Sequence, residues 1–167
     1  FRNQLRKLVW KLIQGFSIFK KQNPDTKAKL LLHTYWEEGW KIPQFMREFG
    51  VDKEDVLTTY ICGDCRHVEV RPYEGQEAKC SACGAEKLVN PRTLFGCTEE
   101  ELNLVYNSMD AYIHPMTSGG LEIPIVEALL AGRPVATVPY SCGTEFTKND
   151  FVTSIGYTEY REMVFNF

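Results

Sequence analysis

The sequence predicts an α/β fold, with a parallel sheet covered by helices on both faces and a small cysteine-rich insertion. Short apolar segments typical of buried strands alternate with amphipathic helical segments along the chain. Four of the six cysteines fall within residues 62–90, which interrupt that alternation. The 167 residues, 44% of them apolar, suffice for a domain with a buried core.

The first half of the chain predicts two helices and two strands. Apolar residues recur at helical spacing over residues 6–21, and the apolar run 28–33 is typical of a strand buried on both faces. Residues 41–50 predict the next helix, which ends at a glycine. The β-branched residues of 55–61 predict the second strand.

After residue 90 the alternation of strands and helices resumes. Residues 93–96 predict a short strand, and Thr98 begins a helix in which Glu101 is placed as the capping-box partner. A strand, a helix and another strand follow at residues 110–114, 123–131 and 134–138. Short connections between these segments favour a parallel sheet.

Charge and hydropathy exclude several classes of protein. A formal net charge of −3 provides no broad basic surface for nucleic acid or anionic lipid. No apolar run approaches the roughly 20 residues of a membrane span, and nothing resembles a secretory signal. We therefore expect a cytoplasmic protein without a transmembrane segment. Because the chain opens without methionine, we also expect a fragment of a longer protein.

The cysteines of residues 62–90 are spaced as zinc ligands. Cys62-x-x-Cys65 and Cys80-x-x-Cys83 each direct two thiolates to one point, and together they complete a tetrahedral shell. The spacing predicts a zinc ribbon with a closed, structural site. Two disulfides would need an oxidising compartment, and a redox Cys-x-x-Cys normally occurs singly. A ribbon can also dock nucleic acid or protein, but its basic residues are matched by acidic ones.

The segment TSGGLEIPIVEALLAGRPVA, residues 117–136, carries a resemblance to a known family. Residues 93–138 resemble the donor-binding domain of group 1 glycosyltransferases, a retaining family with the GT-B fold. The family segment reads approximately Ser-x-Glu-Gly-Phe-Gly-Leu-Pro-x-x-Glu-Ala, then small residues and Gly-x-Pro-Val. Its Arg-x-x-x-x-Lys pair matches Arg2 and Lys7. The positions in register within the segment are Pro124, Glu127, Ala128, Gly132, Pro134 and Val135.

The resemblance covers nearly the whole chain except residues 62–90. It implies that residues 1–61 and 91–167 form a Rossmann-like sheet, the C-terminal half of a GT-B fold. The implied reaction moves a hexose from a nucleoside-diphosphate sugar to an acceptor (a glycan, lipid or protein) with retention. The N-terminal acceptor domain is missing, so we expect this chain to bind the nucleotide sugar but hardly to transfer the hexose.

The resemblance also assigns site residues. Arg2 and Lys7 would act as catalytic cations on the leaving diphosphate, and Glu127 would hold the donor ribose. A glycine-rich loop entering a helix presents backbone N–H groups to a diphosphate. The substrate-binding residues expected in this loop are Ser118, Gly119, Gly120, Leu121 and Glu122.

One departure from the family bears on the donor sugar. The family's first glutamate corresponds to Gly119, and Glu122 stands where glycine is usual. Glu122 either contacts the sugar or caps its own helix. The rival reading is a non-catalytic glycosyltransferase-like module that uses the zinc ribbon for partner or nucleic-acid binding. His33 and His114 end predicted strands, so each either lines the ligand crevice or packs in the core.

Overall fold

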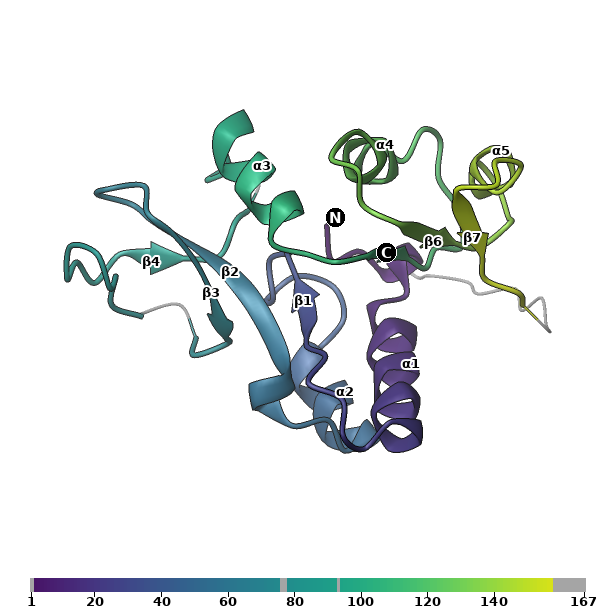
Figure 1. Ribbon diagram of the computed structural model, residues 1–167. Helices are drawn as coiled ribbons and strands as arrows, with labels where there is room; N and C mark the ends of the chain where they lie inside the picture. Colours follow the sequence, from purple (N-terminus) through teal and green to yellow (C-terminus); the bar gives the residue numbers. More distant parts are fainter. Residues whose placement is uncertain (1, 76–77, 93, 158–167) are drawn as a thin grey trace.

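The computed structural model describes residues 2–75, 78–92 and 94–157, and their strands form two separate sheets (Figure 1). In the first sheet, β1 (Leu30–Leu32) runs parallel to β2 (Val56–Cys62). Two further strands, β3 (Val68–Pro72) and β4 (Leu88–Val89), pair antiparallel with β2.

The second sheet is parallel throughout. It consists of β5 (Tyr112–His114), β6 (Val135–Thr137) and β7 (Val152–Ser154) in that order. The described residues therefore form a mixed α/β structure with a small parallel sheet, which confirms the predicted class. They do not form the single Rossmann-like sheet that we expected, because β1 and β5 are not paired with each other.

The helices begin and end close to their expected positions. Leu8 has a left-handed φ of +49° and separates a short 3₁₀ turn, η1 (Leu5–Lys7), from α1 (Val9–Gln22), so the first α-helix starts later than expected. Gly50 ends α2 (Ile42–Phe49) with a φ of +65°. The remaining helices are η2 (Lys53–Asp55), α3 (Glu99–Asn107), α4 (Ile123–Leu130) and α5 (Gly143–Phe146).

Two predictions around α3 had different outcomes. Thr98 and Glu101 form the expected capping box, each side chain accepting a hydrogen bond from the other residue's backbone N–H. Of the strand predicted at 93–96, the described residues 94–96 form only an isolated bridge between Phe95 and Arg92, and Thr93 lies outside the described residues. The short elements α5 and β7 were not predicted.

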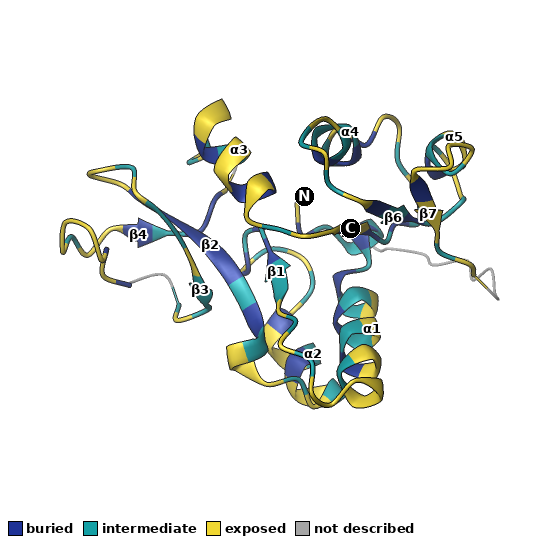
Figure 2. Ribbon diagram, viewed as in Figure 1, coloured by how far each residue is buried: buried dark blue, intermediate teal, exposed yellow. Residues whose placement is uncertain are grey.

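Each sheet has its own hydrophobic core (Figure 2). Helices α1 and α2 pack together against β1 and β2, where Ile13, Leu32 and Val56 are fully buried. Helices α3 and α4 pack against the second sheet around Ile125 and Ala128. In Figure 1, α1 and α2 lie below the strands and α3 and α4 above them.

Candidate functional site

The four ribbon cysteines converge on a single point. Their sulfur atoms all lie within 4.8 Å of one another. The Cys62–Cys83 sulfurs are 3.6 Å apart and the Cys65–Cys80 sulfurs 3.7 Å. A tetrahedral zinc with bonds of about 2.3 Å would set its sulfurs about 3.8 Å apart. A disulfide would need about 2.05 Å, so the arrangement fits a structural metal and not two disulfides.

The two Cys-x-x-Cys turns have the same backbone geometry. The carbonyl of Cys62 accepts a hydrogen bond from the N–H of Arg66 at 3.1 Å, and that of Cys80 accepts one from Gly84 at 2.9 Å. Arg66 and Gly84 both adopt left-handed φ angles, +60° and +75°. A backbone N–H of Cys65 directed at the Cys62 sulfur lowers the pKa of Cys62 to about 7, whereas hydrogen bonds from neighbouring thiols and burial raise the pKa values of Cys65 and Cys83.

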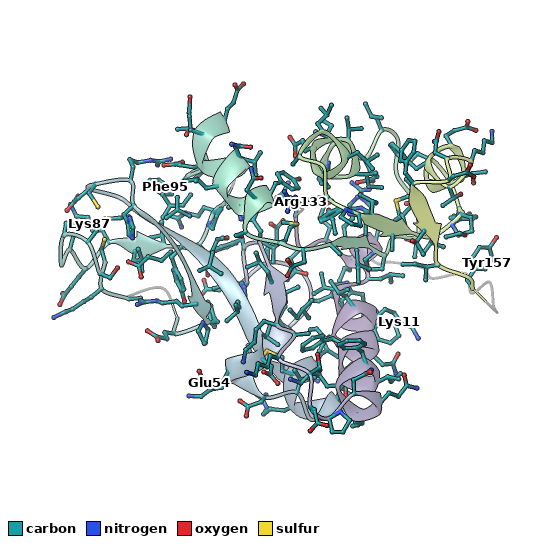
Figure 3. All side chains as sticks on the ribbon, in the orientation of Figure 1. Lys11, Glu54, Lys87, Phe95, Arg133 and Tyr157 are labelled. Carbon is teal, nitrogen blue, oxygen red and sulfur yellow. The ribbon has the colours of Figure 1, made fainter. Side chains whose placement is uncertain are left out.

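The ribbon is continuous with the first sheet. Its strands β3 and β4 both pair with β2, so the insertion extends a sheet strand instead of forming an independent unit. Tyr60, Ala78 and Leu88 pack around the buried Cys62 and Cys80. In Figure 3, Lys87 marks the outer end of this region, beside the sulfur atoms.

Arg66 connects the ribbon to α3. Its Nε donates to Glu101 Oε1 at 2.8 Å, its Nη2 donates to the Gly96 carbonyl at 3.0 Å, and its guanidinium lies 4.7 Å from the Phe95 ring centroid. Burial raises the pKa of Glu101, but Arg66 and the Thr98 N–H lower it more, so the pKa lies below its ordinary value. Glu101 therefore both caps α3 and anchors the ribbon.

The basic side chains of the ribbon are largely paired with acidic ones. Lys87 contacts Asp64 at 2.8 Å and Lys79 contacts Glu86 at 3.2 Å. Such exposed pairs add little stability, but they reduce the net charge offered to a phosphate backbone. The ribbon surface therefore lends no support to a nucleic-acid interface.

A second polar cluster surrounds Glu122, the residue that precedes α4. Its side chain is only 8% exposed and forms a buried ion pair with the Lys7 ammonium, which is 5% exposed. His114 Nε2, at the carboxyl end of β5, lies 3.2 Å from the same carboxylate, and Arg6 Nη1 lies 3.6 Å from it. Two segments far apart in sequence, residues 6–7 and residues 114–122, therefore meet at this carboxylate.

The loop that carries Glu122 is tied to the segment before α1. The N–H of Thr117 donates to the Arg6 carbonyl at 3.0 Å, and Arg6 Nη1 donates to the Ser118 carbonyl at 2.9 Å. On the other side, Ser141 Oγ donates to the Gly119 carbonyl at 2.8 Å. These contacts hold the glycine-rich loop between Arg6 and Ser141.

Gly119 makes room for the Glu122 carboxylate. A Cβ atom at residue 119 would lie 1.9 Å from Glu122 Oε1, whereas one at Gly120 would meet nothing within 4 Å. Although Glu122 occupies the N-cap position of α4, its side chain makes no capping hydrogen bond. Glu122 therefore does not cap α4 through a side-chain hydrogen bond, and its carboxylate pairs with Lys7.

Burial and pairing determine the charges in this cluster. Burial raises the pKa of Glu122, but hydrogen bonding and attraction from Lys7 lower it more, so the pKa lies below its ordinary value. Burial lowers the pKa of Lys7 and lowers that of His114 to about 4. Glu122 and Lys7 therefore form an ion pair, and His114, with a pKa of about 4, is neutral at neutral pH.

Other predicted site residues lie at different places. Glu127 is half-buried one turn into α4, and its Oε2 accepts a hydrogen bond from the Tyr106 hydroxyl at 2.8 Å. Arg2 is exposed and pairs with Glu38, in the loop after β1, at 2.7 Å. Arg6, which the sequence analysis did not single out, contacts the glycine-rich loop in place of Arg2.

His33 is a packed histidine at the end of β1. Its Nδ1 lies 2.6 Å from Thr59 Oγ1, and its Nε2 lies 3.8 Å from the Cys97 sulfur. Burial lowers its pKa to about 3. His33 is half-buried and also lines a cavity of about 1450 Å³, so neither alternative for this residue is decided.

No protein-family model, curated protein or solved structure matches this chain. Among the described residues, no helix has both the length and the apolar character needed to cross a membrane.

Proposed function

We propose that this chain binds the nucleoside-diphosphate sugar of a retaining GT-B glycosyltransferase. The observation that carries the proposal is the meeting of residues 6–7 with the 117–122 loop at the carboxyl end of β5. Carboxyl ends of parallel strands are where α/β proteins bind ligands. The family resemblance pairs these two parts of the sequence in one diphosphate site.

The charges of the cluster suit a diphosphate. Arg6 and Lys7 provide two cations against the one carboxylate of Glu122, since His114 is neutral. The N-terminus of α4 adds a partial positive charge and backbone N–H groups. Glu122 holds Lys7 in place without a ligand, and a diphosphate would share that ammonium. Stabilising charge on the leaving diphosphate is the catalytic role assigned to such cations.

Glu127 has the acceptor capacity that a ribose requires. Tyr106 donates to its Oε2, which fixes the side chain. The two carboxylate oxygens together offer about four acceptor sites, so capacity remains for two vicinal hydroxyls. Tyr106 is thus a positioning residue in this proposal, and Glu127 contacts the substrate.

Calorimetric titration with UDP, GDP, ADP and their sugars tests the proposal. We expect saturable binding to one nucleotide class, weakened more than tenfold by Glu127→Gln. The matched control is Glu100→Gln, which removes an exposed carboxylate from the first turn of α3. Absence of binding by all three nucleotides, or equal binding by the two variants, would refute the proposal.

The reaction requires an acceptor-binding half in addition to the donor site. We expect the isolated chain to bind the donor without transferring the hexose. A zinc ion held by the four thiolates would have no direct part in this chemistry, because it would keep no open coordination position. Such an ion would stabilise the ribbon that Arg66 attaches to α3.

A further inference from the structure

Arg66 occupies a backbone position that favours glycine. It directly follows the first Cys-x-x-Cys pair, and its φ of +60° is left-handed. The equivalent residue after the second pair is Gly84, with a φ of +75°. A left-handed backbone is unfavourable for an L side chain but not for glycine. The contacts of the arginine side chain show what offsets this strain.

The Arg66 side chain leaves the ribbon and reaches the start of α3. Its Nε and Nη2 donate to the two carboxylate oxygens of Glu101 at 2.8 and 2.5 Å. Such a bidentate pair fixes the direction of both groups. The backbone N–H of Arg66 meanwhile donates to the Cys62 carbonyl at 3.1 Å. The backbone of Arg66 thus belongs to the metal-binding turn, and its side chain belongs to the cap of α3.

Helix α3 depends on contacts made by its ends. With nine residues it is shorter than the roughly 12–15 residues that an isolated helix needs to be stable in water. Its first turn is closed by the Thr98–Glu101 capping box, and Arg66 holds the same carboxylate. Glu101 is only 7% exposed, so loss of the arginine would leave a largely desolvated charge without its cation. The ribbon therefore contributes directly to the stability of α3.

The last turn of α3 holds Glu127. The Tyr106 hydroxyl donates to Glu127 Oε2 at 2.8 Å and to the Pro124 carbonyl at 3.3 Å. Tyr106 is buried in one apolar cluster with Ile125 and Ala128 of α4. In Figure 1, α3 stands between the ribbon strands and α4. A continuous set of contacts therefore runs from the ribbon cysteines through α3 to Glu127.

We propose that Arg66 is a positioning residue that couples metal binding in the ribbon to the orientation of Glu127. A metal on the four sulfurs fixes the first Cys-x-x-Cys turn, and Arg66 then holds Glu101 at the start of α3. Without the metal this turn loses its fixed geometry, so α3 loosens and the Tyr106 hydroxyl loses its place. The coupling between ribbon and α3 needs no nucleotide. Only its consequence for ribose binding by Glu127 rests on the proposed function.

Hydrogen–deuterium exchange with and without zinc tests the coupling. Exchange is measured over α3 and, as an internal reference, over α2, which packs with α1 in a separate core. We expect removal of zinc by a chelator to speed exchange in α3 at least about tenfold and in α2 by less than about twofold. Equal acceleration in the two helices would show global unfolding and would overturn the proposal.

Arg66→Gly is the decisive variant, because it reproduces the residue found in the second turn. Glycine accepts the left-handed backbone, so we expect the variant to retain one zinc ion per chain. Its α3 should exchange fast with or without zinc. Lys87→Gln is the matched control, since Lys87 pairs with Asp64 within the ribbon at 2.8 Å. In this control, exchange in α3 should keep its dependence on zinc.

A second variant changes the helix side of the contact and leaves the ribbon intact. Glu101→Gln keeps a side chain that a capping box accepts but removes the charge that pairs with Arg66. We expect it to weaken the zinc dependence of exchange in α3. Zinc-dependent protection of α3 that persists unchanged in Arg66→Gly or in Glu101→Gln would overturn the proposal.

Nucleotide titration distinguishes failure of the coupling from failure of the donor-binding proposal. If one nucleotide class binds, zinc removal and Arg66→Gly should each weaken that binding, whereas Lys87→Gln should not. Binding that survives both changes would leave the donor site in place and overturn the positioning role of Arg66. If no nucleotide binds, the donor-binding proposal fails, and exchange in α3 alone decides the coupling.

Discussion

Removal of the Glu122 charge tests the buried cluster most directly. Glu122→Gln preserves the shape of a side chain that fills the space above Gly119. It leaves the Lys7 ammonium, only 5% exposed, without its carboxylate partner. Breaking one partner of a buried ion pair costs about 3–5 kcal/mol, because the remaining charge stays desolvated.

The expected loss follows from this burial. In a domain of this size 1 kcal/mol shifts the Tm by about 2–4 °C, so Glu122→Gln should lower the Tm by roughly 6–20 °C. Lys7 can reduce the loss by releasing its proton, since burial already lowers its pKa. The lower end of the range is therefore expected at high pH.

Urea unfolding and calorimetry of a double-mutant cycle provide the assay. Lys7→Met combined with Glu122→Gln removes both charges, and most of the stability should return. Glu145→Gln is the control, because the Glu145–Lys148 pair is exposed and should contribute no more than about 1 kcal/mol. A loss for Glu122→Gln no larger than the control, or strict additivity in the cycle, would refute the buried-pair argument.

Three other predictions concern packing, pH and metal. Gly119→Ala should lower the free energy of unfolding, measured in urea, by about 1–3 kcal/mol, because its Cβ would overlap a carboxylate oxygen of Glu122. Gly120→Ala, whose Cβ would meet open space, should change it by no more than about 0.5 kcal/mol. Burial lowers the pKa of His114 to about 4 in the folded chain, so as the pH falls the unfolded chain binds a proton at this residue before the folded chain does. The free energy of unfolding should therefore fall by about 3 kcal/mol between about pH 6.5 and pH 4. His114→Gln should flatten this part of the pH profile. Zinc measured by mass spectrometry should be one ion per chain and should be lost in Cys80→Ser but retained in Cys97→Ser, which lies outside the four-sulfur cluster; equal zinc in both would exclude this site.

Local features of the molecule could be predicted from the sequence because their causes lie within a few residues. The Thr98–Glu101 capping box and the Gly50 helix stop each depend on one turn of backbone. The zinc-type cluster was equally predictable, because each Cys-x-x-Cys turn brings its own two thiolates together. The alternating apolar segments likewise predicted the α/β class.

Contacts between distant segments were decided only by the tertiary structure. Lys7 and Glu122 are 115 positions apart, and only the chain path brings them together. Glu101 was predicted as a cap, but its second contact, Arg66, comes from the ribbon. The division into two sheets could not be predicted from the spacing of apolar residues. An apolar strand has the same sequence pattern whether its second edge is paired or open. Periodicity records which face of an element is buried, whereas partners and charge pairing depend on which segments the fold places side by side.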